Sequence, residues 1–387
     1  MTVSETARPN YLRPVLVTTT LVAIIGLLFG VPWWTLVAAA DWPAPVSAVG
    51  SVAFGVAGLG LPALMFFGHG RGHDGSSRAG DTLLGVAWVL FPWSLIGNAL
   101  RLVLSVSGVE QAARISAVAV AAVSVVLLAW GHFEAMRVPR VKEVRITMSR
   151  LGPGLDGTRV VLLTDTHYGP IDRAKWSAKV TDVVNELDAD IVCHTGDIAD
   201  GTVDMRREQA APLETIKARL ARVYVTGNHE YYGDPIGWLE HMRALGWEPL
   251  RNQHRVIERD GDRLVLAGID DHTAHHSGHP GHRADLTTAM AGADPSLPVL
   301  LLAHQPKQIG QAEAAGVDLQ ISGHTHGGQM WPFNHLVRLD QPEVAGLAQR
   351  TERTQLYTSR GTGFWGPPFR IFAPSEITLI TLHSPSR

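Results

Sequence analysis

The chain has 387 residues, of which 45% are hydrophobic and 18% are charged, and its formal net charge is −3. This balance excludes a disordered chain, and it lacks the positive excess of a nucleic-acid binder, so no nucleic-acid polymer is expected as a partner. A single cysteine, Cys193, excludes a disulfide framework and a cysteine-based zinc site. The first 140 residues hold 14 charged side chains and the remaining 247 hold 55. We therefore expect two domains, residues 1–140 and 141–387.

Four uncharged stretches occupy the first domain: residues 14–40, 42–70, 82–100 and 115–133. Each is near or above the roughly 18 to 20 residues that a helix needs to cross the hydrocarbon core of a membrane. Inside a bilayer the backbone must satisfy its own hydrogen bonds, which favours helices. Tryptophans such as Trp33, Trp42 and Trp130 stand near the ends of these stretches, as at a membrane interface. The pattern predicts four transmembrane helices, with the lipid bilayer as a partner.

The first stretch has a second interpretation, a cleaved signal peptide. Arg8 and Arg13 precede its apolar run, and the run ends on Ala38-Ala39-Ala40. The run is long for a signal peptide, however, and three more apolar stretches follow it. We expect an uncleaved helix.

Lysine and arginine residues flank the four stretches unequally. Two basic residues flank the first and third loops, namely Arg101 and Arg114. Eight lie on the other side, at the N-terminus, in the second loop and after the fourth stretch: Arg8, Arg13, Arg71, Arg78, Arg137, Arg140, Lys142 and Arg145. Basic residues favour the cytoplasmic side of a membrane. The bias predicts a multi-pass protein of the cell (inner) membrane whose second domain is cytoplasmic.

From residue 141 onward, short β-branched runs alternate with amphipathic segments. Residues 160–163, 191–193, 223–225 and 299–302 read as buried strands, and 172–188 and 213–220 as helical. This alternation predicts an α/β domain with its catalytic groups on loops after strand ends. Five histidines between His272 and His282 stand among Gly, Ser and Pro, which favours a solvated loop over a metal-storage tract.

Polar clusters follow the apolar runs. They are Asp165-Thr166-His167, residues 196–200, residues 227–230, His304, and residues 323–329. Because strand ends of an α/β sheet converge at one edge, these side chains are expected to share one site. Carboxylate oxygens, imidazole nitrogens and an Asn carbonyl suit Mn, Fe or Zn. The lack of cysteine in the clusters argues against a structural zinc site.

The five clusters, read in order as D-x-H, G-D-x-x-D, G-N-H-E, H and G-H-x-H, resemble the calcineurin-like metallophosphoesterases. The resemblance covers roughly residues 160–329. Together with Ser359-Arg360-Gly361-Thr362-Gly363, it points to the membrane-associated YkuE/YaeI-type branch and to transmembrane proteins with a metallophosphoesterase domain. The resemblance implies a β-sandwich flanked by helices behind the membrane anchor, and a metal-dependent phosphoric ester hydrolase.

Position by position, the resemblance implies two divalent metal ions. One would be held by Asp165, His167 and His326. The other would be held by Asn228, His304 and His324, with Asp197 bridging both. Two such ions lie about 3.5–4 Å apart and activate a bridging hydroxide for in-line attack on phosphorus.

Two further residues have implied catalytic roles. His229 stays free of metal and is the candidate proton donor to the leaving oxygen. Asp200 is expected to orient His229; the alternative for Asp200 is a helix N-cap. Phosphoprotein phosphatases follow G-D-x-x-D with Arg-Gly, whereas Gly201-Thr202 follows Asp200 here. The arginine that would grip a phosphomonoester is thus missing at that place.

These features predict a membrane-anchored phosphodiesterase. Few residues separate Phe133 from the first expected strand near Lys142, which favours a lipid-linked or membrane-proximal phosphate ester. The alternatives are a cyclic-nucleotide phosphodiesterase or a phosphomonoesterase and, in another class, a non-catalytic membrane interaction module. Arg360 and Tyr231 are candidate substrate-binding residues, with a salt bridge and core packing as their respective alternatives.

Overall fold

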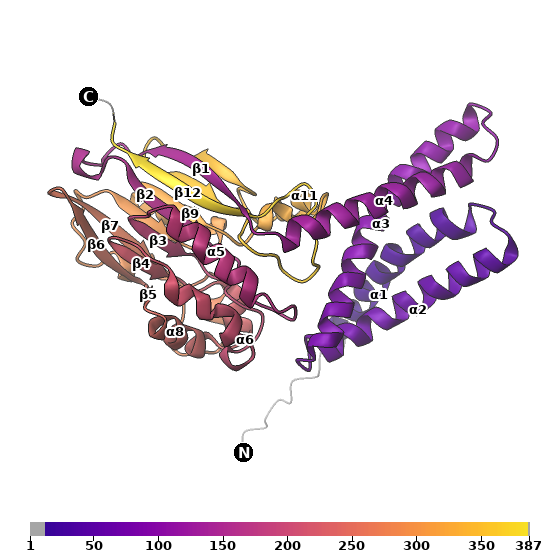
Figure 1. Ribbon diagram of the computed structural model, residues 1–387, viewed down its shortest axis with the longest axis horizontal. Helices are drawn as coiled ribbons and strands as arrows, with labels where there is room; N and C mark the ends of the chain where they lie inside the picture. The colour runs from indigo at the N-terminus through magenta and orange to yellow at the C-terminus, as the bar shows by residue number, and fades with distance from the viewer. Residues whose placement is uncertain (1–11, 386–387) are drawn as a thin grey trace, which may run out of the picture. The chain divides into compact units, whose positions relative to one another are not determined.

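The computed structural model describes residues 12–385, and the chain divides into two compact units, residues 1–129 and 130–387 (Figure 1). Arg8, one of the basic residues that flank the first apolar stretch, lies outside the described residues.

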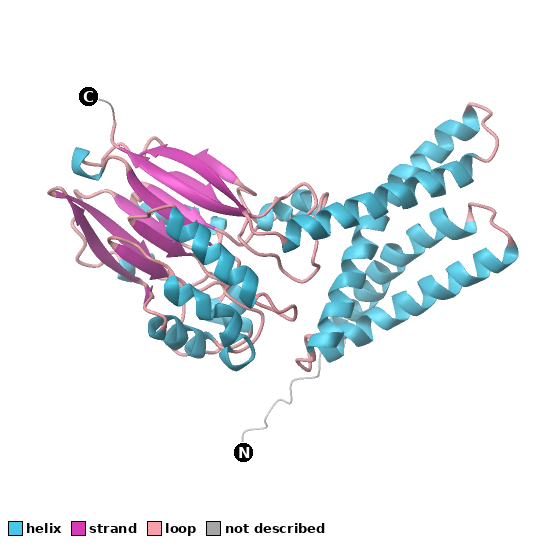
Figure 2. Ribbon diagram, in the orientation of Figure 1, coloured by secondary structure: helices cyan, strands magenta, loops and turns pink. Residues whose placement is uncertain are grey.

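The first unit is built from long apolar helices (Figure 2). They are α1 (Leu12–Trp33), continued by a π-helical turn (Trp34–Ala38), α2 (Ala44–Gly68), α3 (Asp74–Val106) and α4 (Ala112–Met136). All four are long and apolar enough to cross a bilayer, which confirms the expected helices. The last seven residues of α4 belong to the second unit.

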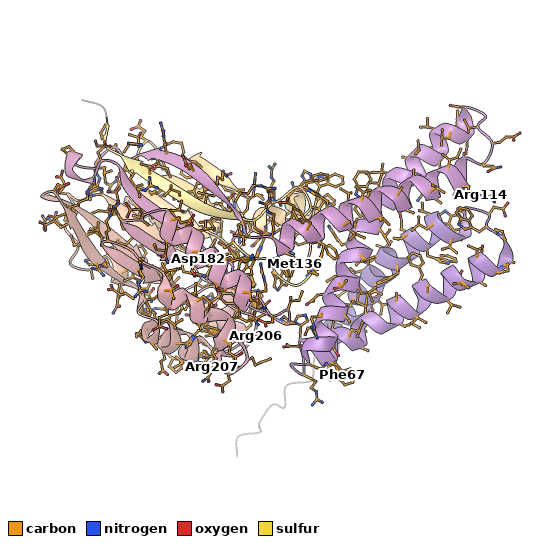
Figure 3. The ribbon with its side chains drawn as sticks, viewed as in Figure 1. Phe67, Arg114, Met136, Asp182, Arg206 and Arg207 are labelled. Carbon is orange, nitrogen blue, oxygen red and sulfur yellow. The ribbon has the colours of Figure 1, made fainter. Side chains whose placement is uncertain are left out.

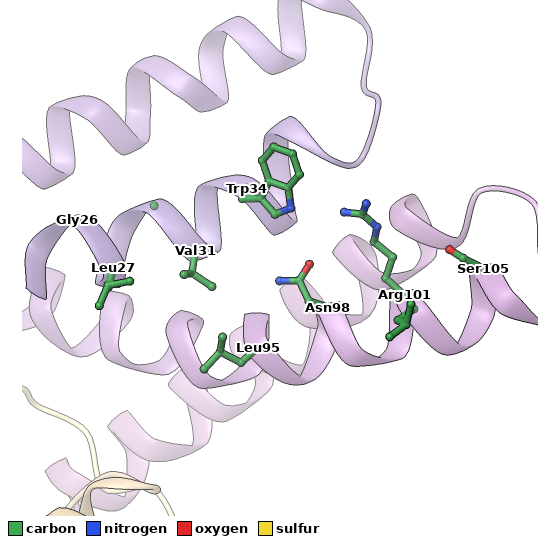
Figure 4. Close-up of a pocket in the computed structure, with 10 residues that line it drawn as sticks. Gly26, Leu27, Val31, Trp34, Leu95, Asn98, Arg101 and Ser105 are labelled. Atoms are coloured by element: carbon green, nitrogen blue, oxygen red, sulfur yellow. The ribbon is translucent and has the colours of Figure 1, made fainter. Parts of the chain in front are cut away.

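A cavity of about 800 Å³ lies between α1 and α3 (Figure 4). Its lining is mainly apolar, with Asn98, Arg101 and Ser105 as polar members. The Asn98 amide donates to Thr35 Oγ1 at 2.7 Å and to the Ser94 carbonyl at 2.9 Å. The polar amide therefore also ties α3 to the end of the first helical segment.

The second unit contains two six-stranded sheets. The first has the order β1 (Arg140–Thr147), β12 (Glu376–His383), β2 (Thr158–Leu163), β3 (Ile191–His194), β4 (Ala221–Tyr224) and β5 (Glu248–Pro249). The second has the order β10 (Gly346–Gln349), β11 (Gln355–Thr358), β9 (Leu319–Ser322), β8 (Val299–Leu302), β7 (Asp262–Gly268) and β6 (Gln253–Arg259). One buried cluster joins the inner faces, with Leu162 and Ile191 from the first sheet and Leu266 and Leu300 from the second. The two sheets therefore form a sandwich.

Helices cover both outer faces of the sandwich, and Figure 1 labels those on the first sheet. On the first sheet lie α5 (Ala174–Glu186), α6 (Val203–Ala210) and α8 (Pro235–Ala244), and on the second lie α9 (Leu286–Ala289) and α10 (Ile309–Ala315). Trp176 of α5 and Trp238 of α8 pack in one apolar cluster with Val161 of β2. The expected fold, a helical anchor followed by a helix-flanked β-sandwich, is confirmed.

The expected helix over residues 213–220 was wrong. The chain makes one 3₁₀ turn, Ala211–Thr215, and then runs extended into β4. Arg222 Nη1 donates to the carbonyls of Glu214 and Ile216, each at 2.9 Å, and Trp247 Nε1 donates to the carbonyl of Leu213 at 3.1 Å. Side chains thus take the carbonyls that a longer helix would use for its own hydrogen bonds.

Candidate metal centre

The candidate ligands lie on loops that follow parallel strands of the two sheets. Strands β2, β3 and β4 run parallel to one another, as do β8 and β9. Asp165 and His167 follow β2, Asp197 follows β3, Asn228 follows β4, His304 follows β8, and His324 and His326 follow β9. Parallel strands deliver their following loops to the same edge of a sheet. The sandwich therefore gathers these side chains at one edge.

Asp165, His167 and His326 form the first group of candidate ligands. The Nε2 atoms of His167 and His326 lie 3.1 Å apart, and His326 Nε2 lies 3.6 Å from Asp165 Oδ1. All three residues are buried, and their ligand atoms lie within 4.8 Å of one another. The geometry suits a single cation between them.

Asn228, His304 and His324 belong to a second group, together with Asp197. His304 Nε2 lies 3.1 Å from Asn228 Oδ1 and 3.2 Å from Asp197 Oδ2. The ligand atoms of Asp197, His304 and His324 lie within 4.8 Å of one another. Asp197 Oδ2 is also 3.6 Å from His167 Nε2 in the first group. The structure thus brings all seven candidate ligands together and sets the Asp197 carboxylate between the two groups.

Hydrogen bonds from the backbone orient these ligands. His304 Nδ1 lies 2.8 Å from the Thr195 carbonyl, so it donates there and leaves Nε2 as the free ring nitrogen. Asp165 Oδ1 accepts the backbone N–H of His324 at 2.9 Å. Asp197 Oδ1 accepts the backbone N–H of His229 at 2.8 Å. The ligand atoms are therefore held in place before any ion binds.

The backbone at the site is strained. Five of the seven candidate ligands have positive φ angles, a region that residues other than glycine rarely adopt: Asp165, His167, Asp197, His324 and His326. Such strain collects at functional sites, where the surrounding structure enforces it. Gly227 and Gly323 allow the close packing, because a Cβ at these positions would collide with Asp197 Oδ1 and Asp165 Oδ2, respectively.

Asp200 contacts two histidines. Its Oδ1 atom lies 2.7 Å from His229 Nδ1 and 2.9 Å from His167 Nδ1. The N-cap of the following helix, α6, is Thr202. Burial alone would lower the pKa of His229, but the Asp197 and Asp200 carboxylates raise it to about 9. His229 also groups with His167 and Asp197, and the ligand atoms of these three residues lie within 4.8 Å of one another.

The two candidate substrate-binding residues differ in their surroundings. Tyr231 is buried, and its hydroxyl lies 3.2 Å from both Thr226 Oγ1 and His282 Nδ1. Arg360 is partly exposed, its stem packs beside Gly327, and its guanidinium forms no hydrogen bond or ion pair within residues 12–385. Arg360 is therefore available to a ligand, whereas the Tyr231 hydroxyl is engaged in the wall of the site.

Four further residues border the cluster, Tyr232, Trp365, Glu230 and Arg370, and sequence reasoning gave no role to Glu230 and Arg370. The rings of Tyr232 and Trp365 lie 5.2 and 5.8 Å from the His229 ring and are 71% and 48% exposed.

The Glu230 carboxylate accepts the backbone N–H groups of Asp197 at 3.0 Å and Ile198 at 2.7 Å, which fixes the loop that follows β3. The position of Glu230 in the G-N-H-E cluster was the sequence signal that could have identified it.

Arg370 is the fourth of these residues and is fully buried. Its Nη1 atom donates to the carbonyls of His326 at 2.7 Å and Arg360 at 2.8 Å, and its Nη2 atom lies 3.1 Å from His326 Nδ1. Burial lowers the pKa of Arg370 to about 10, so the side chain stays cationic at neutral pH. No motif in the sequence singles it out.

The donor set fits divalent cations. Asp165 and Asp197 are buried carboxylates, and burial raises the pKa of Asp165. A buried carboxylate needs a cationic partner or strong hydrogen bonds to offset its lost hydration. Burial is the main cause that lowers the pKa of His324 to about 3, which keeps its imidazole neutral and able to bind metal. Oxygen and imidazole donors together suit Mn, Fe or Zn.

Comparison with known proteins places this site in context. The family model described as calcineurin-like phosphoesterase matches residues 158–328. The "Transmembrane protein with metallophosphoesterase domain" of Danio rerio is 40% identical over 267 residues, which cover 67% of this chain and 61% of that protein. The matched region thus spans about three fifths of the length of that relative.

Two bacterial relatives are covered more completely. An uncharacterized metallophosphoesterase of Aquifex aeolicus is 30% identical over 261 residues, or 67% of this chain and 97% of the relative. The uncharacterized metallophosphoesterase YkuE of Bacillus subtilis is 30% identical over 251 residues, or 62% of this chain and 85% of the relative. Each match thus covers about two thirds of this chain and most of the length of the relative.

Proposed function

Since the chain belongs to the calcineurin-like metallophosphoesterase family of phosphoric ester hydrolases, we propose that it is a membrane-anchored phosphodiesterase. The observation that carries this proposal is the convergence of seven candidate ligands from five loops, with Asp197 within 3.6 Å of one group and 3.2 Å of the other. A non-catalytic interaction module would not need this complete set, which favours an enzyme.

The ligand assignment follows the two groups. Asp165, His167 and His326 would hold one divalent ion. Asn228, His304 and His324 would hold the other, with Asp197 shared. When bound, two such ions supply a water nucleophile at neutral pH and stabilise the charge that develops in an in-line displacement.

The remaining residues bind the ester and move a proton. His229 Nδ1 is engaged by Asp200 at 2.7 Å, so Nε2 is the atom that would deliver a proton to the leaving oxygen. Asp200 also fixes the ring of His167, and so acts as a positioning residue for both histidines. Arg360 would bind a nonbridging phosphate oxygen. Gly201 after Asp200 offers no side chain to grip a second anionic oxygen, which supports a diester over a monoester.

For the location, we propose a multi-pass protein of the cell (inner) membrane with the hydrolase domain on the cytoplasmic side. The four apolar helices and the eight-to-two bias of flanking basic residues support this arrangement. We propose residues 1–140 as the anchor and 141–387 as the hydrolase domain, because the chain passes from the last apolar helix to the first strand near this boundary. The substrate would be a lipid-linked or other membrane-proximal phosphate ester.

The proposal is tested by assaying the purified full-length chain with Mn²⁺ on bis(p-nitrophenyl) phosphate, p-nitrophenyl phosphate and cyclic nucleotides. Hydrolysis of the diester, lost on chelation and restored by Mn²⁺, is the expected result. Faster hydrolysis of the monoester or of a cyclic nucleotide would replace the diester assignment with one of those alternatives. Metal-loaded protein that hydrolyses none of these esters would contradict the proposal.

A further inference from the structure

The last two turns of α4 pack against the segment 364–372, which also lines the metal centre. The Arg370 backbone N–H donates to the Gly131 carbonyl at 2.8 Å, and His132 Nδ1 lies 3.1 Å from the Pro368 carbonyl. The rings of Trp130 and Phe372 are 5.5 Å apart. All these contacts lie within the second unit.

This packing sets the depth of the segment relative to the end of the apolar helix. Figure 3 labels Met136, the residue at which α4 ends. At about 1.5 Å of rise per residue, Trp130 lies roughly 9 Å before that end. A bilayer is about 40–45 Å thick including its headgroups, around a hydrocarbon core of about 30 Å. The polar layer on each side is therefore about 5–7 Å thick. With Met136 at the outer edge of this layer, Trp130 and its neighbour Phe372 would lie near the boundary between the polar layer and the hydrocarbon core.

Large apolar side chains of this region face outward. Trp130, Trp365 and Phe372 are 37%, 48% and 57% exposed. Helix α11 (Phe333–Val337) begins three residues after Met330, which bridges to Ile371 of the same segment, and it exposes Phe333 and Leu336 by 39% and 49%. These five side chains, from Trp130, Phe333, Leu336, Trp365 and Phe372, are called the interfacial collar below.

Phe372 is held in an unfavourable backbone conformation. Its φ angle is +59°, which is an outlier for a bulky residue. Burial does not compensate for this strain, because the ring is more than half exposed. An apolar surface outside the protein would supply the missing stabilisation.

The same segment reaches the candidate catalytic groups. The Trp365 ring lies 5.8 Å from the His229 ring. The Trp365 backbone N–H donates to Gln329 Oε1 at 2.9 Å, three residues beyond His326. One side of the segment thus borders the metal centre, and the other packs on the membrane helix.

We propose that the interfacial collar inserts into the headgroup layer of the bilayer and that the metal centre takes the phosphodiester of a membrane lipid presented there. Tryptophan favours this layer because its ring is apolar and carries a polar N–H, and the Phe and Leu side chains of the collar add apolar area. The continuity of the collar with α4 selects the lipid surface as its occupant. The choice of substrate rests on the proposed function, whereas the insertion of the collar does not.

Insertion is tested by fluorescence quenching on the full-length chain in lipid nanodiscs. Native Cys193 is buried, so a labelled cysteine can be placed at Phe372→Cys and, as a matched control, at Val256→Cys on β6, where the side chain is 42% exposed. Phosphatidylcholine spin-labelled near its headgroup should quench the environment-sensitive dye at 372 and leave the dye at 256 unchanged. Equal fluorescence at 372 with and without spin-labelled lipid would overturn the insertion.

The substrate class is tested with two esters that share a reacting centre, methyl p-nitrophenyl phosphate in solution and hexadecyl p-nitrophenyl phosphate in the nanodisc. The wild-type enzyme should favour the hexadecyl ester by about tenfold or more in kcat/KM, as expected when an aromatic surface binds an alkyl chain. Phe372→Asn removes the ring, and asparagine tolerates the left-handed backbone. This variant should lose that preference and keep its rate on the methyl ester.

The outcomes separate the two proposals. No preference by the wild type, or equal loss of both activities in Phe372→Asn, would overturn the lipid substrate. If the wild-type protein hydrolyses neither ester, the proposed function is contradicted instead. The quenching experiment alone would then test whether the interfacial collar inserts into the headgroup layer.

Discussion

At the scale of single residues, Asp197 is the residue that links the two ligand groups of the site. One carboxylate oxygen, Oδ2, approaches His167 of the first ligand group and His304 of the second, while Oδ1 accepts the backbone N–H of His229. The Glu230 carboxylate in turn accepts the Asp197 N–H at 3.0 Å. The residue thus connects both proposed ions to the candidate proton donor through short contacts.

His229→Gln tests the role of the proposed proton donor. The change keeps a polar side chain but removes the group that would protonate the leaving oxygen, so kcat for a diester should fall by about 10²–10⁴-fold. Because His229 is proposed to bind no metal, elemental analysis should find the same metal content as in the wild type. Loss of one ion per chain would instead make His229 a ligand, as its position beside His167 and Asp197 permits.

Arg370→Lys tests a positioning residue for His326. Lysine keeps the charge but cannot reproduce the guanidinium hydrogen bonds to the carbonyls of His326 and Arg360. Loss of such outer contacts typically weakens metal affinity by about 10–100-fold, so chelator titration should remove metal at lower chelator concentration. The control is Arg360→Lys, which should retain metal normally. Equal metal retention in all three proteins would show that Arg370 does not tune the site.

The ligand residues were predictable from sequence because their order and spacing after apolar runs form a specific pattern. Their positive φ angles were not predictable, because Asp and His are enriched in that conformation but adopt it in only a small fraction of their occurrences. Arg370 was also missed. It lies in the run Pro367-Pro368-Phe369-Arg370, outside every cluster, and reaches His326 only through the tertiary fold.

At the scale of elements, parallel strands and the end of α4 position the site. Most interior strands were predictable, because runs such as 160–163 and 299–302 are continuously apolar. The outer strands β10 and β6 were missed. Gly346–Gln349 contains no β-branched residue, and Gln253–Arg259 is largely polar, so neither carries the usual strand signal. Their pairing partners, β11 and β7, determine their conformation.

Gly131→Ala tests the packing of α4 on segment 364–372. A Cβ at this helical position would lie 2.7 Å from Ile371 Cγ1, so the segment must move. Overpacking of this kind costs about 1–3 kcal/mol, which should outweigh the gain of about 1 kcal/mol in helix propensity. The free energy of unfolding of the full chain in detergent should therefore fall.

The matched control for this change is Gly55→Ala in α2, where a Cβ would have no neighbour within 4 Å. The free energy of unfolding of this control variant should stay unchanged or rise. A Gly131→Ala protein as stable as this control would show that α4 is not held against the segment.

At the scale of the whole molecule, the low average charge results from joining an apolar helical unit to a hydrolase domain of ordinary charge. The sequence was sufficient to predict this division, because uncharged runs of helix-spanning length are rare in other contexts. The packing of the last turns of α4 into the second unit was not predictable, since it depends on contacts such as Arg370 to Gly131.

A topology reporter tests the orientation. A reporter fused after Arg387 should be active in the cytoplasm, because the hydrolase domain follows the flank with the greater number of basic residues. The same reporter inserted in the loop between α3 and α4, at residues 107–111, should report the opposite side. Activity of the first fusion only outside the cell would contradict the cytoplasmic placement.

The central claim is that Asp197 unites two ligand groups in a metal-dependent hydrolase. It is tested most directly by the rate at which Mn²⁺-loaded Asp197→Ala hydrolyses bis(p-nitrophenyl) phosphate, compared with the wild type under the same conditions. We predict a rate no higher than that of chelator-treated wild-type enzyme. A variant that hydrolyses the diester at the wild-type rate would contradict the account.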